Sequence, residues 1–343
     1  MSFGGRDSLS DYEFTFEAYL DHSARIEADP DLLSNEELIY DYHRENGRTY
    51  HTYRSGSFYV PNDELETDRM DNQYEILKIL LDGRHYLAPL SRENPPRKIL
   101  DVATGTGRWA IEMADEFPEA QIIGTDLSPI QPQMVPPNLR FYIDDGNEEW
   151  QTGKDWFDID FIHFRVTVAA WSDWRSMIRM SFERLRPGGW LEIQEPKCDI
   201  DCDVGEIPPD NPVKRWFTEL QKASIIAGRP IHEIPELKRM LLEAGFVDVH
   251  EKVYKIPLNG WPRSRRLKRI GELWHHCMED GLSGFSYAFF HRCLGMTKDE
   301  IEISLVDVRR GLGDQRLHAY EKFYVVWGRK PVDAPEPRDH PMS

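Results

Sequence analysis

The stretch 99–109, ILDVATGTGRW, joins an apolar run to a glycine-rich turn and then to a helical pattern. A strand, a glycine turn and a helix N-terminus together bind the middle of nucleotide-like ligands. A G-x-G-x-x-A pattern begins at Gly105, and Asp126 lies 19 residues beyond the second glycine, as in dinucleotide-binding sequences. Sites for NAD, FAD and S-adenosylmethionine (SAM) all share a glycine turn and an acidic residue for the ribose hydroxyls.

Three features favour SAM over the dinucleotides. The carboxylate of Asp101 suits the ammonium group of a methionine moiety, and it would repel a pyrophosphate. The stretch IDDG at 143–146 follows an apolar run, and a carboxylate there can accept a hydrogen bond from an adenine amino group. A Pro-Gly-Gly turn starts at Pro187, before another apolar run. The alternative is that Gly105 and Gly107 only form a tight turn.

The elements that must position these residues alternate short apolar runs with helical patterns from Arg97 onward. This alternation is typical of an α/β fold with a mostly parallel sheet. Apolar residues spaced i, i+3, i+4 and i+7 predict a helix over 173–185. Four prolines in SPIQPQMVPPN exclude a long helix between the second and third strands. The predicted strands are 97–102, 120–125, 139–143, 157–163 and 189–195.

The flanking segments contain further predicted helices. Asn62 is expected to cap a helix that ends before Gly83. Beyond the fifth strand we expect, in order, an irregular insertion at 196–230, a helix near 232–244, a strand, helices over 263–312 and a last strand.

Taken in order, the motifs resemble the class I SAM-dependent methyltransferase pattern over roughly residues 97–200. Longer stretches resemble fungal LaeA-like methyltransferases: ENGRTYHTYRSGSFYVPNDELETDRMD, GTDLSPIQPQMVPPNLRFYIDD, FDIDFIHFR, LRPGGWLEIQE, AGFVDV and HAYEKFYVVWGRKP. This resemblance implies a Rossmann-like class I methyltransferase fold. The expected sheet has seven mostly parallel strands, with an N-terminal helical lid and a C-terminal helical insertion.

The resemblance also implies a domain division. We expect an acidic, loosely ordered arm at 1–39, a lid at 40–96, a SAM-binding domain at 97–330 and a flexible tail at 331–343, with insertions in the domain at 196–230 and 258–315.

By motif position, half of the ten predicted cofactor-binding residues lie in the glycine loop or at the end of the strand before it. The methionine end of SAM is assigned to Asp101, Ala103, Thr104, Gly105 and Gly107. The ribose is assigned to Asp126, packing on the adenine to Leu127, and the adenine amino group to Asp145, with Asp144 as the near alternative and Gly146 beside them. Trp150 is expected either to cover the adenine or to belong to the core.

Two residues depart from the family pattern. Ala103 stands where glycine is general, and Tyr74 stands where histidine is expected. An added methyl group at residue 103 is harmless if its φ is negative, which we expect. Ala103→Gly is therefore predicted to change SAM affinity by less than about tenfold.

Methyl transfer from a sulfonium is an in-line displacement, so the enzyme mainly aligns the reactants and excludes water. His163 is the candidate general base, if the acceptor must lose a proton; its alternative is a hydrogen bond at the end of the sheet. Arg165 is expected to hold an acidic substrate or a lid carboxylate. Glu195 is expected to line the acceptor pocket or to pair with an arginine.

The lid segment is rich in tyrosine and arginine. One interpretation is that Tyr50, Arg54 and Tyr59 close over SAM and shape the acceptor site. The other is that they pack an aromatic N-terminal helix on the sheet edge. A basic cluster at 263–269 is interpreted as a nuclear import signal, as a patch for an anionic partner or, more simply, as a solvated helix face.

Composition limits the partners. A net charge of −18 argues against direct binding of nucleic acid. The sequence contains no run of about 18 apolar residues, so no membrane span is predicted. The N-terminus does not read as a secretory signal, and four cysteines suggest a reducing compartment, nuclear or cytoplasmic. No metal site is expected, even beside His275, His276 and Cys277.

The resemblance implies transfer of a methyl group to a small-molecule or protein acceptor, in metabolite tailoring or in regulation. One alternative is a catalytically weak SAM-binding regulator that acts through velvet-type protein partners. A distant alternative, an NAD-linked oxidoreductase, rests on the glycine pattern alone.

Overall fold

One sheet of eight strands forms the centre of the computed structural model, which describes residues 27–28, 42–54, 56–91, 93–150 and 156–334. The strand order is β1-β6-β5-β4-β7-β8-β10-β9. The strands are β1 (Glu27–Ala28), β4 (Lys98–Val102), β5 (Gln121–Asp126), β6 (Leu139–Ile143), β7 (Ile159–Arg165), β8 (Leu185–Cys202), β9 (Val247–Pro257) and β10 (Ala319–Arg329). Strands β6 to β8 run parallel, and β10 lies antiparallel between β8 and β9. The predicted mostly parallel seven-stranded sheet is confirmed, and the short β1 adds an eighth strand beside β6.

Helices cover both faces of the sheet. Ile99 and Leu100 are consecutive in β4, so their side chains point to opposite faces. On the face of Ile99, α3 (Arg108–Glu116) packs through Trp109 and Met113. The face of Leu100 packs against α4 (Trp174–Arg184) and α6 (Leu237–Glu243), which follows the short helix η3 (Ile234–Glu236).

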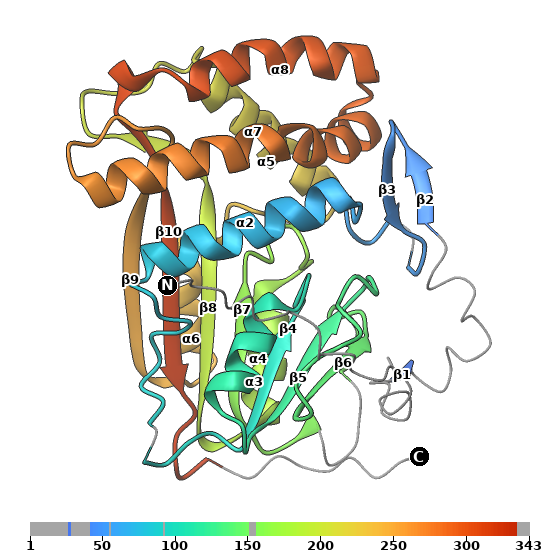
Figure 1. Cartoon of the computed structure of the whole chain (residues 1–343), viewed down its shortest axis with the longest axis vertical. Helices are drawn as coiled ribbons and strands as arrows, with labels where there is room; N and C mark the ends of the chain where they lie inside the picture. Colours follow the sequence, from blue (N-terminus) through green and yellow to red (C-terminus); the bar gives the residue numbers. More distant parts are fainter. Residues whose placement is uncertain (1–26, 29–41, 55, 92, 151–155, 335–343) are drawn as a thin grey trace, which may run out of the picture.

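A second group of helices lies across one end of the sheet (Figure 1). It consists of α2 (Glu64–Leu80), α5 (Pro212–Ile226), α7 (Arg265–Leu294) and α8 (Lys298–Leu312). The short helix η4 (Gln315–Leu317) then leads into β10. Buried aromatic and aliphatic side chains join α2, α5, α7 and α8 into one core with β8 and β10. This group, α2, α5, α7 and α8, therefore covers the carboxyl ends of the parallel strands, and we call it the helical roof.

Most predicted elements are present, with some differences. As expected, no helix lies between β5 and β6 in the described chain. The insertion 196–230 is not irregular throughout, because β8 extends to Cys202 and α5 follows, with its N-terminus capped by Asn211. Pro212 occupies the first turn of α5, where its missing N–H costs nothing.

The N-terminal segment is only partly helical. A hairpin of β2 (Tyr42–Glu45) and β3 (Arg48–His51) precedes α2. The N-cap of α2 is Asp63, whose carboxylate accepts from the backbone N–H of Glu66, and not Asn62 as predicted. Apart from β1, the arm 1–39 lies outside the described residues, and so does the tail from residue 335. Among the helices that the structure describes, none has the length and apolar character needed to span a membrane.

Candidate active site

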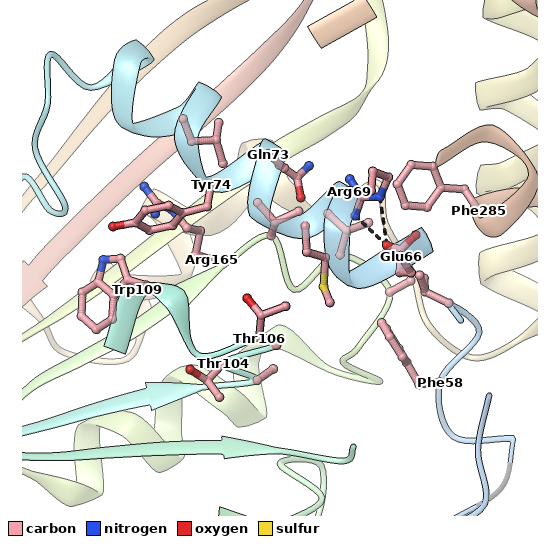
Figure 2. Close-up of a pocket in the computed structure, with 18 of the residues that line it drawn as sticks. Phe58, Glu66, Arg69, Gln73, Tyr74, Thr104, Thr106, Trp109, Arg165 and Phe285 are labelled. Atoms are coloured by element: carbon pink, nitrogen blue, oxygen red, sulfur yellow. Dashed lines mark hydrogen bonds and ion pairs between the residues drawn. The ribbon is translucent and has the colours of Figure 1, made fainter. Parts of the chain in front are cut away.

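A pocket lies between the carboxyl ends of β4 and β7 and the helical roof. Figure 2 shows α2 on one side of the pocket and Thr104 and Thr106 of the glycine loop on the other, with Tyr74 near Arg165 and Arg69 beside Phe285. The lining residues are Phe58, Val60, Glu66, Arg69, Met70, Gln73, Tyr74, Leu77, Asp101, Ala103, Thr104, Gly105, Thr106, Arg108, Trp109, Arg165, Val166, Val168, Ala169, Leu220, Ile231, Phe285 and Phe289. The pocket lies at the position where open α/β sheets bind their ligands.

The glycine loop is a tight turn with left-handed backbone at three positions. Ala103, Gly105 and Gly107 have φ values of 55°, 60° and 77°. The N–H of Gly107 donates to the carbonyl of Thr104 at 3.0 Å, which closes the turn. The expected negative φ at Ala103 is therefore wrong. A left-handed conformation also explains why the family pattern has glycine at this position.

Glycine is required at residue 107 for a second reason. A Cβ atom built there would lie 2.3 Å from Cζ of Phe141, well inside contact distance. At Gly105 the nearest atom to such a Cβ is the sulfur of Met70, at 3.4 Å. The loop therefore brings bare backbone to the start of α3, with α2 directly above it.

Asp101, at the end of β4, is held at both carboxylate oxygens. Its Oδ1 lies 2.8 Å from Nδ1 of His163, and its Oδ2 accepts from Thr104 Oγ1 at 2.5 Å. His163 is fully buried, and its ring stacks on that of Trp109 with centroids 3.7 Å apart. Burial lowers the pKa of His163 to about 4. Because His163 is absent from the pocket lining, its placement agrees with the alternative of a hydrogen bond at the sheet end.

Asp126, at the end of β5, supports the glycine loop from below. Its carboxylate accepts from the backbone N–H groups of Gly105, at 2.8 Å, and Ser128, at 3.0 Å. Burial raises its pKa to about 6, against the effect of these two hydrogen bonds. Gln131 donates to the carbonyl of Gly105 at 2.7 Å, and Asn62 donates to Ser128 Oγ at 3.3 Å. The lid and the loop after β5 therefore meet beside the assigned ribose position.

The residues assigned to the adenine follow β5 and β6 and lie outside the pocket lining. Asp145 Oδ1 accepts from the backbone and side chain of Asn147, at 3.1 and 3.2 Å. Asp144 donates its backbone N–H to the carbonyl of Asp126, and Leu127 is half-buried. A Cβ atom on Gly146 would lie 2.7 Å from the ring of Trp171.

Trp150 belongs to the core. It is buried among the side chains on the α4 face of the sheet, and its indole N–H donates to the carbonyl of Gly146 at 3.0 Å. Of the two predicted roles, this placement agrees with the core residue.

Arg165, at the end of β7, lines the pocket beneath Tyr74 (Figure 2). Its Nε donates to Gln194 Oε1 at 3.0 Å, and its guanidinium carbon lies 5.1 Å from the centre of the Tyr74 ring. The Tyr74 hydroxyl is 2.9 Å from Nδ1 of His85. The tyrosine that replaces the expected histidine therefore covers the arginine and forms part of the pocket wall.

Glu195 has neither of the two roles predicted from the sequence, a place in the pocket lining or a pair with an arginine. Its Oε1 accepts from the backbone N–H and the hydroxyl of Thr167, at 2.7 and 2.6 Å, and burial raises its pKa to about 8. It does not line the pocket, and none of the ion pairs among the described residues joins it to an arginine. Its carboxyl group instead anchors the loop after β7, whose Val166 and Val168 do line the pocket.

The three lid residues singled out in the sequence, Tyr50, Arg54 and Tyr59, do not line the pocket. Tyr59 stacks on Phe289 with centroids 4.5 Å apart, and Tyr50 is buried beside Arg292. Arg54 is exposed and lies 3.6 Å from Glu148, on the loop after β6. In the part of the lid that precedes α2, Phe58 and Val60 line the pocket.

Sequence reasoning linked Tyr74 of α2 to the acceptor side but missed the other α2 side chains and the contribution of α7 to the pocket wall. One signal was present, because Gly281 and Gly284 are three residues apart in α7. A Cβ on Gly281 would lie 2.9 Å from Cδ of Arg69, and one on Gly284 would lie 3.3 Å from Oε2 of Glu66. The two glycines let α7 approach α2, whose buried Glu66–Arg69 ion pair of 2.6 Å faces the pocket.

One residue of the basic cluster at 263–269 has a structural role. Arg266 of the basic cluster donates to the carbonyls of Ile79 and Leu80 and pairs with Asp82 at 2.8 Å, which caps the end of α2. Its neighbours Arg263, Arg265, Lys268 and Arg269 are exposed, as on a solvated helix face. Within the described part of the chain, no group of His, Cys, Asp or Glu side chains could hold a metal ion.

The site fits the cofactor that the sequence predicts. SAM needs contacts for its ammonium group, along the loop backbone and for its ribose. A carboxylate fixed at the end of β4, a left-handed turn with no room for a side chain at residue 107 and a buried carboxylate at the end of β5 fit these needs. A methyltransferase-domain family model matches residues 71–251.

Curated relatives match over most of the chain. Methyltransferase pytC of Aspergillus terreus is 36% identical over 307 residues, which cover 89% of this chain and 93% of pytC. Secondary metabolism regulator LAE1 of Cochliobolus heterostrophus is 35% identical and covers 84% of this chain and 94% of its own. Protein-methionine methyltransferase laeA of Emericella nidulans is 30% identical, covering 88% of this chain and 80% of its own.

Proposed function

The chain belongs to the fungal LaeA-like family of class I SAM-dependent methyltransferases, and on that premise we propose that it methylates a small, largely apolar acceptor in fungal secondary metabolism. The observation that carries this proposal is the composition of the pocket wall opposite the glycine loop. That wall consists of Leu77, Val168, Ala169, Leu220, Ile231, Phe285 and Phe289. Polar side chains also line the pocket, among them Tyr74, Arg165 and the Glu66–Arg69 pair. A predominantly apolar wall combined with placed polar groups is typical of small-molecule sites.

The roof of the pocket also favours a small acceptor. Helix α2 is linked to the glycine loop by Thr106, which donates to Asp71 at 2.7 Å, and by the pair of Arg108 and Glu75 at 3.2 Å. These contacts place α2 over the loop from which the methyl group must be delivered. A folded polypeptide would need an open groove at this point, whereas a small molecule needs only the cavity.

Bound SAM would supply a methyl group attached to a sulfonium sulfur, which is a good leaving group because it departs as a neutral thioether. In our proposal Asp101 binds the methionine ammonium and Asp126 the ribose hydroxyls, while Tyr74 and Arg165 border the acceptor side. The apolar wall excludes water from the reacting atoms and aligns the acceptor, which are the main requirements of an in-line displacement.

Calorimetric titration with S-adenosylhomocysteine (SAH) and SAM tests the cofactor assignment. We expect binding in the micromolar range typical of enzyme ligands. Folded protein that binds neither ligand at millimolar concentration would refute the proposal.

The names of the relatives favour a second candidate, a regulatory methyltransferase with a protein acceptor. Incubation of the purified chain with a fungal lysate and methyl-tritiated SAM, compared with the lysate alone, distinguishes the two candidates. Label in the organic extract supports the small acceptor, and label in protein supports the regulatory role. The velvet-type partner and the nuclear or cytoplasmic location stay predictions, which co-purification and imaging of the tagged chain would test.

A further inference from the structure

We propose that His163 is a positioning residue: it fixes the carboxylate of Asp101 for the methionine ammonium of SAM and takes no proton from the acceptor. This inference rests on the proposed function, since it concerns the same cofactor site. It also replaces the general-base role that the sequence suggested for His163.

The parallel pairing of β4 and β7 sets this contact. Asp101 and His163 are partners in the register of the two strands, so their side chains emerge side by side. Nδ1 of His163 lies 2.8 Å from Oδ1 of Asp101, while Thr104 Oγ1 holds Oδ2. With one partner on each oxygen, the carboxylate has a single favoured rotation and keeps lone pairs for a ligand in the pocket, which Asp101 lines.

The proton of the imidazole can be assigned from its surroundings. Nε2 of His163 is buried and has no hydrogen-bond partner among the residues that the structure describes, whereas Nδ1 faces a carboxylate, which only accepts hydrogen bonds. The neutral ring therefore carries its proton on Nδ1 and donates it to Asp101. Because the ring is neutral, it orients the carboxylate without cancelling the negative charge that attracts an ammonium group.

Trp109 holds the imidazole in plane. The two rings are nearly parallel, at 7°, with centroids 3.7 Å apart. The indole N–H of Trp109 donates to the carbonyl of His85 at 2.9 Å, which fixes the tryptophan in turn. Trp109 lines the pocket, and His163 does not. The histidine is thus shielded from the acceptor by the residues that it supports.

The experiment compares two ligands on matched variants. SAH carries the amino-acid moiety, and 5′-methylthioadenosine lacks it. His163→Leu removes the donor and should weaken SAH binding by about tenfold or more, the scale of one hydrogen bond to a charged group. Binding of 5′-methylthioadenosine should change less than about threefold. His163→Asn, whose amide can reach the position of Nδ1, should restore most of the SAH affinity.

Two further variants guard against loss of folding. Thr104→Val removes the opposite hydrogen bond to Asp101 and should produce the same selective loss of SAH. Phe161→Leu, a fully buried change on the same strand, should show no preference between the ligands. Equal losses of both ligands in the His163 and Thr104 variants would overturn the proposal, as would unchanged SAH affinity with abolished turnover in His163→Asn. Wild-type protein that binds neither ligand would instead refute the proposed function.

Discussion

At the scale of single residues, Ala103 has a conformation that is unfavourable for alanine. Its φ of 55° lies in the left-handed region, which costs a non-glycine residue about 1–2 kcal/mol. The alanine nevertheless presents its backbone to the pocket in the same turn as Gly105 and Gly107. The strain therefore lowers the free energy of unfolding, while the loop keeps its shape.

Ala103→Gly should increase the free energy of unfolding by about 0.5–1 kcal/mol. Glycine relieves the left-handed strain of about 1–2 kcal/mol. Its greater freedom in the unfolded chain costs about 0.5–1 kcal/mol, so the relief is larger. SAH affinity should change by less than about tenfold. Urea unfolding and calorimetry measure the two effects. A much larger gain in affinity would mean that the natural loop is impaired for binding.

Asp126 predicts how cofactor binding depends on pH. Its pKa is raised to about 6 by burial, so the carboxyl group is protonated below that pH. A protonated carboxyl group can no longer accept hydrogen bonds from both ribose hydroxyls. SAH affinity should therefore fall as pH decreases through 6, and that of 5′-methylthioadenosine, which keeps the ribose, should fall in parallel. Asp126→Asn should bind both ligands weakly and remove this dependence; a steep fall that persists in the variant would assign it to another group.

At the scale of elements, the close approach of α7 to α2 depends on Gly281. Alanine there would gain about 1 kcal/mol from helix propensity. Its Cβ, however, would lie 2.5 Å from the ring of Phe285 and 2.9 Å from Cδ of Arg69, and such overpacking costs about 1–3 kcal/mol. Gly281→Ala should therefore lower the stability by about 1 kcal/mol in urea unfolding. Gly313→Ala, on an exposed helix end, should be nearly neutral. A stabilised Gly281→Ala would show that Phe285 turns aside freely.

The elements also show what the sequence can predict. The strands could be predicted because apolar runs between turn residues, such as KILDV at 98–102, are typical of buried strands in a parallel sheet. The hairpin at 42–51 and helix α5 were missed because their residues are mixed in polarity and become ordered through contacts distant in sequence. Trp216 of α5, for example, donates to Ser286 of α7 at 2.8 Å.

The site was predictable to the same extent. The loop residues follow a local pattern, and Asp101 lies in the pocket as the sequence indicates. The side chains of α2 and α7 follow from tertiary packing, which no local pattern encodes. His163 illustrates the limit of prediction from local sequence. Its position near the end of β7 was predicted correctly, but the direction of its ring depends on contacts with Trp109 and Asp101.

At the scale of the whole molecule, the centre of the sheet contains buried carboxyl groups. Glu192 and Glu195 lie on β8 and Glu321 on the adjacent β10, and burial raises their pKa values to about 7, 8 and 8. Each favours the protonated form in the folded chain. Their stabilising contribution is complete below the unfolded pKa of about 4.5 and is lost as pH rises through the folded values. The free energy of unfolding should therefore decrease between pH 5 and pH 8.

Glu321→Gln isolates one of these groups. The backbone N–H of Cys198 donates to Glu321 Oε1 at 3.1 Å, and glutamine keeps an oxygen acceptor there without the titrating proton. The variant should unfold with a shallower pH dependence than the wild type and be more stable at pH 8 by up to a few kcal/mol. Urea unfolding from pH 5 to pH 8 measures this, with the exposed Glu119→Gln as the control for the loss of one negative charge. Parallel curves for the wild type and Glu321→Gln would show that the carboxyl group is already ionised in the folded protein, and that the pH dependence comes from repulsion among the surface charges of a chain with net charge −18.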